Sequence, residues 1–150
     1  MRIIYNRIST SLSEVLPSTQ AAYQPSRGTI EQIQSVQQII EKCKEYNING
    51  YICFVDYTKA FDSLYQPNLW QALKRHTNLP ICYINFLIKA YERSKATIRT
   101  VHGNTRLIDI LRGVKQGDIL SALLFCVALS IILMKAFEEE DYGISIGGIK

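Results

Sequence analysis

The sequence predicts an α+β fold in which helices pack on a small antiparallel sheet. Several segments repeat apolar residues at helical spacing, and the longest of them includes the uncharged stretch 119–134. Residues 51–55, YICFV, form a short, continuously apolar run of strand-forming residues. Two further runs, 96–102 and 105–110, flank the turn pair Gly103-Asn104 and indicate a β-hairpin.

The first third of the chain is expected to hold two helices joined by a polar loop. Apolar residues at helical spacing predict a helix over residues 3–16, which ends at Pro17. Thr29 and Gln32 form a capping box, Thr-x-x-Gln, at the start of a second helix, and the turn-rich cluster 47–50 ends it. The expected apolar stripe of this second helix consists of Ile33, Val36, Ile40 and Cys43.

The remainder is expected to alternate between strands and helices. The run 51–55 suits a strand that is covered on both faces. Pro67 fits the first turn of a helix that continues to His76, and a further helix follows over residues 81–91. After the predicted hairpin, the loop 112–118 leads into the long apolar helix. The glycine-containing segment 142–150 resembles the start of another hairpin.

Length and composition indicate one domain or a part of one. The chain has 150 residues, of which 47% are hydrophobic and 20% charged, a composition that excludes an intrinsically disordered tail. Only 8 glycines and 4 prolines are present, which excludes a collagen-like chain. Seventeen basic and thirteen acidic side chains give a net charge of +4, which is compatible with a polyanionic partner without requiring one.

Neither a membrane span nor a zinc site is expected. The uncharged run 119–134 is sixteen residues long, shorter than the ~20 that cross a bilayer, so it reads as a core helix. The four cysteines include no Cys-x-x-Cys pair and no histidine at zinc-ligand spacing, so reduced, buried thiols are expected. The first twenty residues show no secretory signal. These features favour an intracellular protein, nuclear or cytoplasmic.

Asp56 is a candidate for a metal-binding carboxylate, although on chemical grounds alone a purely structural role is favoured. It directly follows the predicted strand, so its backbone would be fixed while its side chain emerges at the edge of the sheet. Mg²⁺ prefers one or two carboxylates together with water and phosphate oxygens. An alternative stays open: Asp56 starts an Asx turn and Asp62 caps the next helix.

The order of residues around Asp56 resembles a known family. The pattern Phe-x-Asp-x-x-x-Ala-Phe-Asp over residues 54–62 is similar to the first catalytic palm motif of reverse transcriptases, especially those of non-long-terminal-repeat retrotransposons. Residues 112–125, RGVKQGDILSALLF, resemble the palm motif RGVRQGDPLSPLLF. Residues 20–29, QAAYQPSRGT, resemble Q-x-G-F-R-x-x-R-x-T more weakly. Three motifs in the expected order identify the chain as a member of this family.

The resemblance implies a role for individual residues. Asp56 would be catalytic and would bind Mg²⁺, and Phe61 would lie beneath the incoming sugar as a steric gate, although core packing is an equally compatible role. Gln116 and Gly117 would lie near the incoming nucleotide. Arg27, Arg112 and Lys115 would contact nucleic acid, chiefly its phosphates. The implied partners are an RNA template, a DNA primer and deoxynucleoside triphosphates.

The resemblance also implies an incomplete catalytic centre. The family places further catalytic aspartates in a Tyr-x-Asp-Asp hairpin, and the 150 residues contain no adjacent pair of aspartates. The expected organisation is a partial fingers–palm of a right-hand polymerase, with residues 1–50 fingers-like and residues 51–150 palm-like, ending before that hairpin. The expected function is that of a reverse transcriptase fragment that is inactive alone, and the alternative is a non-catalytic nucleic-acid-binding remnant.

The chain departs from the family pattern at several positions of its motifs. Ile119 and Ala122 stand where the family usually has prolines. Ala22, Tyr23 and Gln24 replace Gly, Phe and Arg, and the change at position 24 removes a possible contact with nucleic acid.

Overall fold

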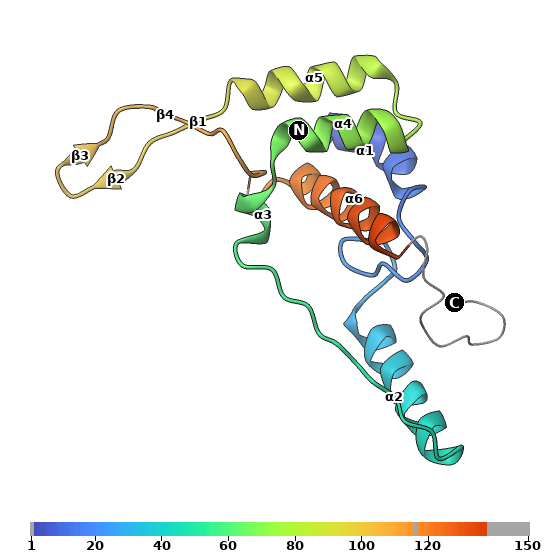
Figure 1. Ribbon diagram of the computed structural model, residues 1–150. Coiled ribbons are helices and arrows are strands. Elements are labelled where there is room, and N and C mark those ends of the chain that lie inside the picture. Colours follow the sequence, from blue (N-terminus) through green and yellow to red (C-terminus); the bar gives the residue numbers. More distant parts are fainter. Residues whose placement is uncertain (1, 116, 138–150) are drawn as a thin grey trace.

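The computed structural model describes residues 2–115 and 117–137. Helices account for most of the regular structure, and four two-residue strands form two antiparallel ladders (Figure 1). The predicted mixture of helices with a small antiparallel sheet is confirmed. In chain order the elements are α1 (Arg2–Ser13), α2 (Thr29–Glu45), α3 (Ala60–Ser63), α4 (Gln66–His76), α5 (Ile81–Glu92), β1 (Lys95–Ala96), β2 (Arg99–Thr100), β3 (Gly103–Asn104), β4 (Ile108–Asp109) and α6 (Ile119–Ala136).

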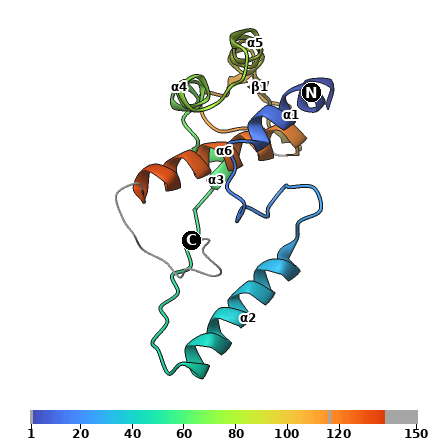
Figure 2. The ribbon, with the colours of Figure 1, turned by 90° about the vertical axis from the view of Figure 1, so that its right-hand side faces the viewer.

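The hydrophobic core lies between helices. Helix α6 packs against α1, α3 and α4, and α4 packs in turn against α5. Figure 2 shows α1, α4, α5 and α6 gathered in the upper part of the molecule. The residues at the centre of this core are fully buried leucines, isoleucines and a valine from these four helices. They are Ile8, Leu12, Leu69, Leu73, Ile84, Leu87, Leu120, Leu123, Leu124 and Val127.

Helix α6 is buried because it is apolar around most of its circumference. It is the one helix in the described ranges, 2–115 and 117–137, that is long and apolar enough to cross a membrane by length and composition. Ten of its eighteen residues are nevertheless buried inside the fold. Apolar residues on several faces suit a helix that is surrounded by other helices. The prediction of a core helix at this position is confirmed.

Helix α2 stands apart from the core in both views (Figures 1 and 2). Its predicted capping box at Thr29 is wrong by one residue, because Gly28 is the N-cap and its backbone N–H donates to the Glu31 carboxylate at 2.9 Å. The predicted apolar stripe exists on the helix but does not reach a core. Ile33 is 56% exposed, and no residue of α2 is buried.

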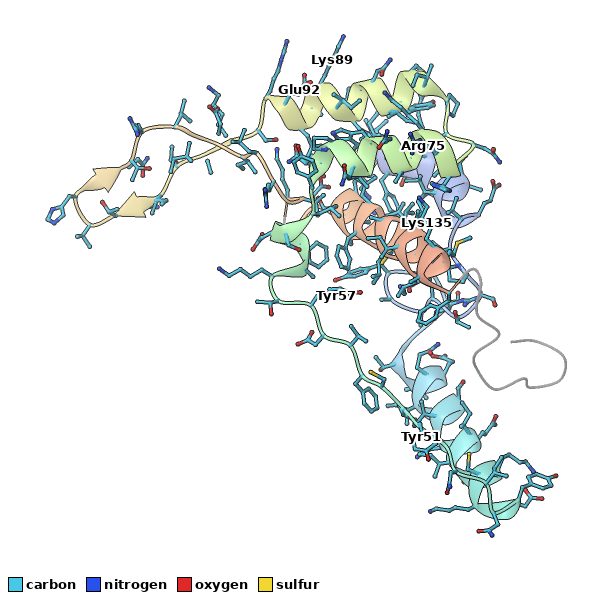
Figure 3. The ribbon with its side chains drawn as sticks, viewed as in Figure 1. Tyr51, Tyr57, Arg75, Lys89, Glu92 and Lys135 are labelled. Atoms are coloured by element: carbon cyan, nitrogen blue, oxygen red, sulfur yellow. The ribbon has the colours of Figure 1, made fainter. Side chains whose placement is uncertain are left out.

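The predicted strand at residues 51–55 is wrong. These residues have no regular secondary structure, and the side chain of Phe54 is 86% exposed. Figure 3 shows Tyr51 and Tyr57 on an extended segment that runs beside α2 and then towards the helical core. A strand needs a hydrogen-bonded neighbour, and no part of the described chain pairs with this segment. The apolar composition of residues 51–55 therefore does not produce a strand, because no described segment supplies the hydrogen bonds that a strand needs.

The predicted hairpin between α5 and α6 is confirmed, with a different turn. β1 pairs with β4 and β2 pairs with β3, so Gly103 and Asn104 lie in a strand and the turn falls at residues 101–102. Two residues lie between β1 and β2, whereas three lie between β3 and β4. One strand of the hairpin therefore has an extra residue, as at a β-bulge. The hairpin projects away from the helices (Figure 1), so the expected packing of helices on a sheet is not observed there.

The four cysteines are free, in agreement with the prediction of reduced thiols. The expectation that they are buried holds only for Cys126. Cys53 and Cys82 are exposed, since the first lies in the extended segment and the second on the outer face of α5. The segment 142–150, where a second hairpin is predicted, lies outside the described residues.

Candidate functional site

Three segments that are distant in sequence meet at one cavity of about 500 Å³. The loop before α2 contributes Tyr23, α3 contributes Phe61, and the segment that enters α6 contributes the rest of the wall. Phe61, Lys115 and Gly117, which were predicted to contact nucleotide or nucleic acid, therefore lie together. The complete lining is Tyr23, Phe61, Lys115, Gly117, Asp118, Ile119 and Ala122.

An aromatic cluster forms one wall of this cavity. The Phe61 ring lies 4.9 Å from the Phe125 ring, between centroids, with an angle of 30° between the ring planes. The Tyr23 ring meets Phe61 edge-on at 6.4 Å and 90°. Contacts of both kinds are favourable between aromatic rings. Phe61 is thus held between a residue of the core helix α6 and a residue of the exposed loop, and it remains half-buried.

Backbone hydrogen bonds fix α3 against the loop that precedes α6. The Val114 N–H donates to the Phe61 carbonyl at 2.9 Å, and the Gly113 N–H donates to the Leu64 carbonyl at 2.8 Å. The side chain of Gln66, which is 7% exposed, donates through Nε2 to the Gly113 carbonyl at 2.9 Å. A buried polar side chain with a partner of this kind fixes the loop in one position.

Gly113 is required at this junction for two reasons. Its φ of +80° is a conformation that favours glycine, and a Cβ atom there would lie 2.8 Å from the Cα of Asp62. Only a residue without a side chain lets the loop approach α3 so closely. Gly113 of the second motif therefore has a local structural reason.

Asp118 begins α6 as its N-cap. Its carboxylate accepts a hydrogen bond from the Leu120 N–H at 3.3 Å, which satisfies one of the free donors of the first turn. The preceding Gly117 has a φ of +85° and nothing within 4 Å of the position where a Cβ would be. The backbone at Gly117 is therefore open towards the cavity.

The loop 20–28 is attached to α6 through a buried thiol. The Gln20 side chain donates to Cys126 Sγ at 3.5 Å, and that thiol lies 3.8 Å from the Ala22 carbonyl, to which it donates. Burial raises the pKa of Cys126, and the hydrogen bond from Gln20 opposes this rise. The thiol therefore stays protonated and able to donate at neutral pH. Tyr23 reaches the cavity because this attachment holds the loop on the helix.

Arg27 and Arg112, which were predicted to face phosphates, both contact the protein itself. The Arg27 guanidinium donates to the carbonyls of Ser18 and Gln20 and so closes its own loop. The Arg112 guanidinium carbon lies 5.7 Å from the centre of the Tyr65 ring, a cation–π contact. Both residues remain exposed, so these contacts are compatible with a further role.

Arg112 also lines a second, smaller cavity of about 220 Å³, which shares Lys115 with the first one. The two cavities therefore adjoin at the loop before α6.

Asp56 does not lie in either cavity. It is exposed on the irregular segment that precedes α3. Within residues 2–115 and 117–137, no group of three or more histidine, cysteine, aspartate or glutamate side chains is placed to hold a metal ion. The described residues therefore do not fit a Mg²⁺ centre at Asp56. Gln116, the remaining predicted site residue, lies outside the described residues.

The sequence interpretation missed three residues that build the cavity. Phe125 was noted only as part of a motif, and Gln66 was not singled out. Tyr23 was noted as a departure from the family pattern but received no role. A glutamine at the start of a helix carries no sequence signal for a contact 47 residues away, whereas the position of Tyr23 within a motif was a usable signal.

Comparison with known proteins gives a consistent result. The family described as "Reverse transcriptase (RNA-dependent DNA polymerase)" matches residues 1–141. The chain is 32% identical over 141 residues to a retrovirus-related Pol polyprotein from the type-1 retrotransposable element R2 of Nasonia vitripennis, which covers 94% of this chain and 14% of the relative.

Two other relatives extend the comparison. The R2 Pol polyprotein of Popillia japonica is 30% identical, over 97% of this chain and 20% of the relative. The RNA-directed DNA polymerase from the mobile element jockey of Drosophila funebris is 28% identical, over 84% of this chain and 14% of the relative. The chain thus spans a fifth or less of the length of these proteins. No solved structure gave a significant match.

Proposed function

Because the chain belongs to the reverse transcriptase family of retrotransposon polyproteins, we propose that it forms part of the nucleotidyl-transfer domain of an RNA-directed DNA polymerase. The reaction is the attack of a primer 3′-hydroxyl on the α-phosphate of a deoxynucleoside triphosphate. The observation that carries the proposal is the cavity at which Tyr23, Phe61 and Gly117 meet. It joins all three sequence motifs, although Tyr23 and Gly117 are 94 residues apart in the chain.

The geometry supports specific roles around this cavity. Phe61, held between two aromatic rings, is rigid enough to act as a steric gate against a ribose 2′-hydroxyl. The open backbone at Gly117 and the exposed Lys115 amino group suit a triphosphate or a nucleic-acid backbone. Arg27 and Arg112 are exposed on the two loops that contribute Tyr23 and Lys115 to the cavity, and they add positive charge to those loops. Gln116 belongs to the same segment and is assigned to the incoming nucleotide by the resemblance alone.

The family is generally Mg²⁺-dependent, and Asp56 is the residue assigned to the metal. A metal site at Asp56 would need carboxylates that the described residues do not bring to it. We therefore propose that the 150 residues alone are catalytically inactive. We also propose that residues 1–50 are fingers-like and residues 51–150 palm-like, and that the protein acts inside the cell, in the nucleus or the cytoplasm. The family match does not favour the alternative of a purely non-catalytic remnant.

A chimaera tests the proposed activity. The matching 141-residue segment of the Nasonia vitripennis relative is replaced by the corresponding segment of this chain, and primer extension on an RNA template is measured with Mg²⁺. Extension is expected, and Asp56→Asn should reduce it by about 10²-fold or more because a carboxylate that would hold Mg²⁺ at the reacting phosphates is lost. The matched control is Glu92→Gln, an exposed carboxylate at the end of α5.

Two outcomes would contradict the proposal. A folded chimaera without any extension would exclude nucleotidyl transfer through this segment, and equal effects of Asp56→Asn and Glu92→Gln would remove the role of Asp56. Separately, Asp56-dependent extension by the isolated 150-residue chain would contradict its proposed inactivity.

A further inference from the structure

The positive charge of this chain is concentrated in one connection. Residues 93–118, which join α5 to α6, hold six of the 17 lysines and arginines and two of the 13 aspartates and glutamates. The remaining residues hold eleven of each. The formal net charge of +4 therefore resides entirely in this connection. Its basic residues are all exposed, and they are Arg93, Lys95, Arg99, Arg106, Arg112 and Lys115.

The two acidic residues of the connection are engaged locally. Asp109 forms an ion pair with Lys95 across the base of the hairpin, with 3.3 Å between Nζ and Oδ1. Asp118 caps α6. Among the described residues, the guanidinium groups of Arg99 and Arg106 form neither an ion pair nor a hydrogen bond. The positive charge of these two arginines is thus not neutralised within the described part of the chain.

The shape of the connection presents these arginines to solvent. The hairpin formed by β1 to β4 projects away from the helical core (Figure 1). Arg99 lies in β2 opposite Asn104, and Arg106 lies in the return strand where an extra residue interrupts the ladder. Bulges of this kind redirect side chains and increase the local twist of a hairpin. An extended, twisted and basic hairpin is suited to follow a regularly charged polyanion.

We propose that the hairpin 93–112 is a nucleic-acid-binding arm that contacts the phosphodiester backbone through Arg99 and Arg106. This inference rests on the proposed function in one respect: the proposed polymerase activity is the reason for expecting the bound polyanion to be a nucleic acid. Guanidinium groups pair with phosphate oxygens in a bidentate manner, and an uncompensated net charge attracts phosphates without regard to sequence. This surface is distinct from the cavity at Phe61, so binding to the arm needs neither a metal ion nor catalysis.

The test measures binding of the full 150-residue chain to fluorescently labelled single-stranded RNA, duplex DNA and an RNA–DNA heteroduplex across a salt series. The double variant Arg99→Gln/Arg106→Gln should bind about tenfold more weakly at low salt, and its slope of log affinity against log salt should fall by about 1.8 on duplex DNA, because two phosphate contacts are lost. The nucleic acid with the largest loss identifies the strand type that the arm follows.

The matched control is Arg75→Gln/Lys89→Gln, which removes two exposed charges from α4 and α5 (Figure 3). It should change affinity by less than about threefold, since these residues lie on the helices and not on the arm. The charge-preserving variant Arg99→Lys/Arg106→Lys should retain most of the affinity and the salt slope. Circular dichroism of all variants verifies that the exposed substitutions leave the fold intact.

Three outcomes would overturn the proposal. They are equal losses for the arm and control variants, no binding of the chain to any of the three nucleic acids at low salt, and an arm-dependent loss seen only with vesicles of anionic phospholipid. None of these results bears on primer extension by the chimaera, so failure of the arm and failure of the proposed polymerase function remain distinguishable.

Discussion

At the scale of single residues, Gly113 shows how a motif position is set by backbone geometry. Its φ of +80° and its approach to Asp62 allow the loop before α6 to dock on α3, where Val114 and Phe61 share a backbone hydrogen bond. The resemblance placed this glycine inside a motif without saying what it does. The structure gives the reason, which is a close contact between two backbones.

Gly113→Ala is expected to destabilise the protein by about 2–4 kcal/mol, because it combines strained backbone with a clash. Gly103→Ala is the matched control, since Gly103 also has a positive φ, +119°, but nothing lies within 4 Å of its Cβ position. Gly103→Ala should lower the free energy of unfolding by about 1 kcal/mol, because only the backbone strain is added. Urea unfolding measures both free energies. Equal costs at the two positions would show that the contact with Asp62 is relieved by a small shift.

Phe61 combines a packing contact with a position at the cavity wall. The sequence allowed both a steric gate and ordinary core packing. The structure places Phe61 half-buried at a cavity wall while it also packs on Phe125, so packing against α6 leaves the proposed role as a steric gate open.

At the scale of elements, a buried hydrogen bond joins α5 to α6. The Tyr91 hydroxyl and the Ser121 hydroxyl lie 3.0 Å apart, and both residues are almost fully buried. The Tyr91 ring also packs edge-on against Trp70 of α4, with 5.2 Å between ring centres. Burial raises the pKa of Tyr91 above its ordinary value of 10.0. The hydrogen bond with Ser121 opposes this rise, and the negative charge of Asp118 adds to it.

Tyr91→Phe should cost about 1–2 kcal/mol of unfolding free energy at neutral pH, because Ser121 loses its partner. Above about pH 10 the unfolded chain releases the phenolic proton while the folded chain retains it, so the wild type loses stability as pH rises. The difference between wild type and Tyr91→Phe should therefore narrow above pH 10. Urea unfolding at several pH values measures this, with the exposed Tyr46→Phe as control. A constant difference up to pH 11.5 would contradict the pKa shift.

Helix prediction succeeded where each helix carries its own signals. Pro67 in the first turn and buried Leu69 and Leu73 define α4 without reference to other segments. The strand at 51–55 failed because a strand, unlike a helix, takes its hydrogen bonds from another segment. The hairpin succeeded since its partner is local, although Gly103-Asn104 proved to be part of the ladder and not its turn.

At the scale of the whole molecule, the apolar surface is divided between a packed and an unpacked part. Helices α1, α4, α5 and α6 bury their apolar faces against each other. Helix α2 and the segment 51–57 keep theirs exposed: Ile30 is 67% and Tyr51 is 92% exposed. The composition of 47% hydrophobic residues therefore does not correspond to one continuous core.

Hydrogen exchange should reveal this division. The amides of α2 are expected to exchange through local opening at a small fraction of the global unfolding free energy, because no residue of the helix is buried. The amides of α6 should approach the global value, since most of its residues lie in the core. Exchange measured by mass spectrometry or NMR compares the two directly, with α4 as a shorter, packed control. Protection of α2 equal to that of α6 would show that α2 is stabilised by contacts that this arrangement lacks.

The sequence by itself determined the family, the positions of the long helices and the presence of a hairpin. These depend on residue order and on local periodicity, which are properties of contiguous segments. Only the tertiary structure decided that Tyr23, Phe61 and Gly117 line one cavity, that Gln66 fixes the loop behind it, that Asp56 stands outside it, and that the hairpin carries its charge into solvent. The physical reason is that such proximity arises from packing between segments dozens of residues apart, which no local pattern encodes.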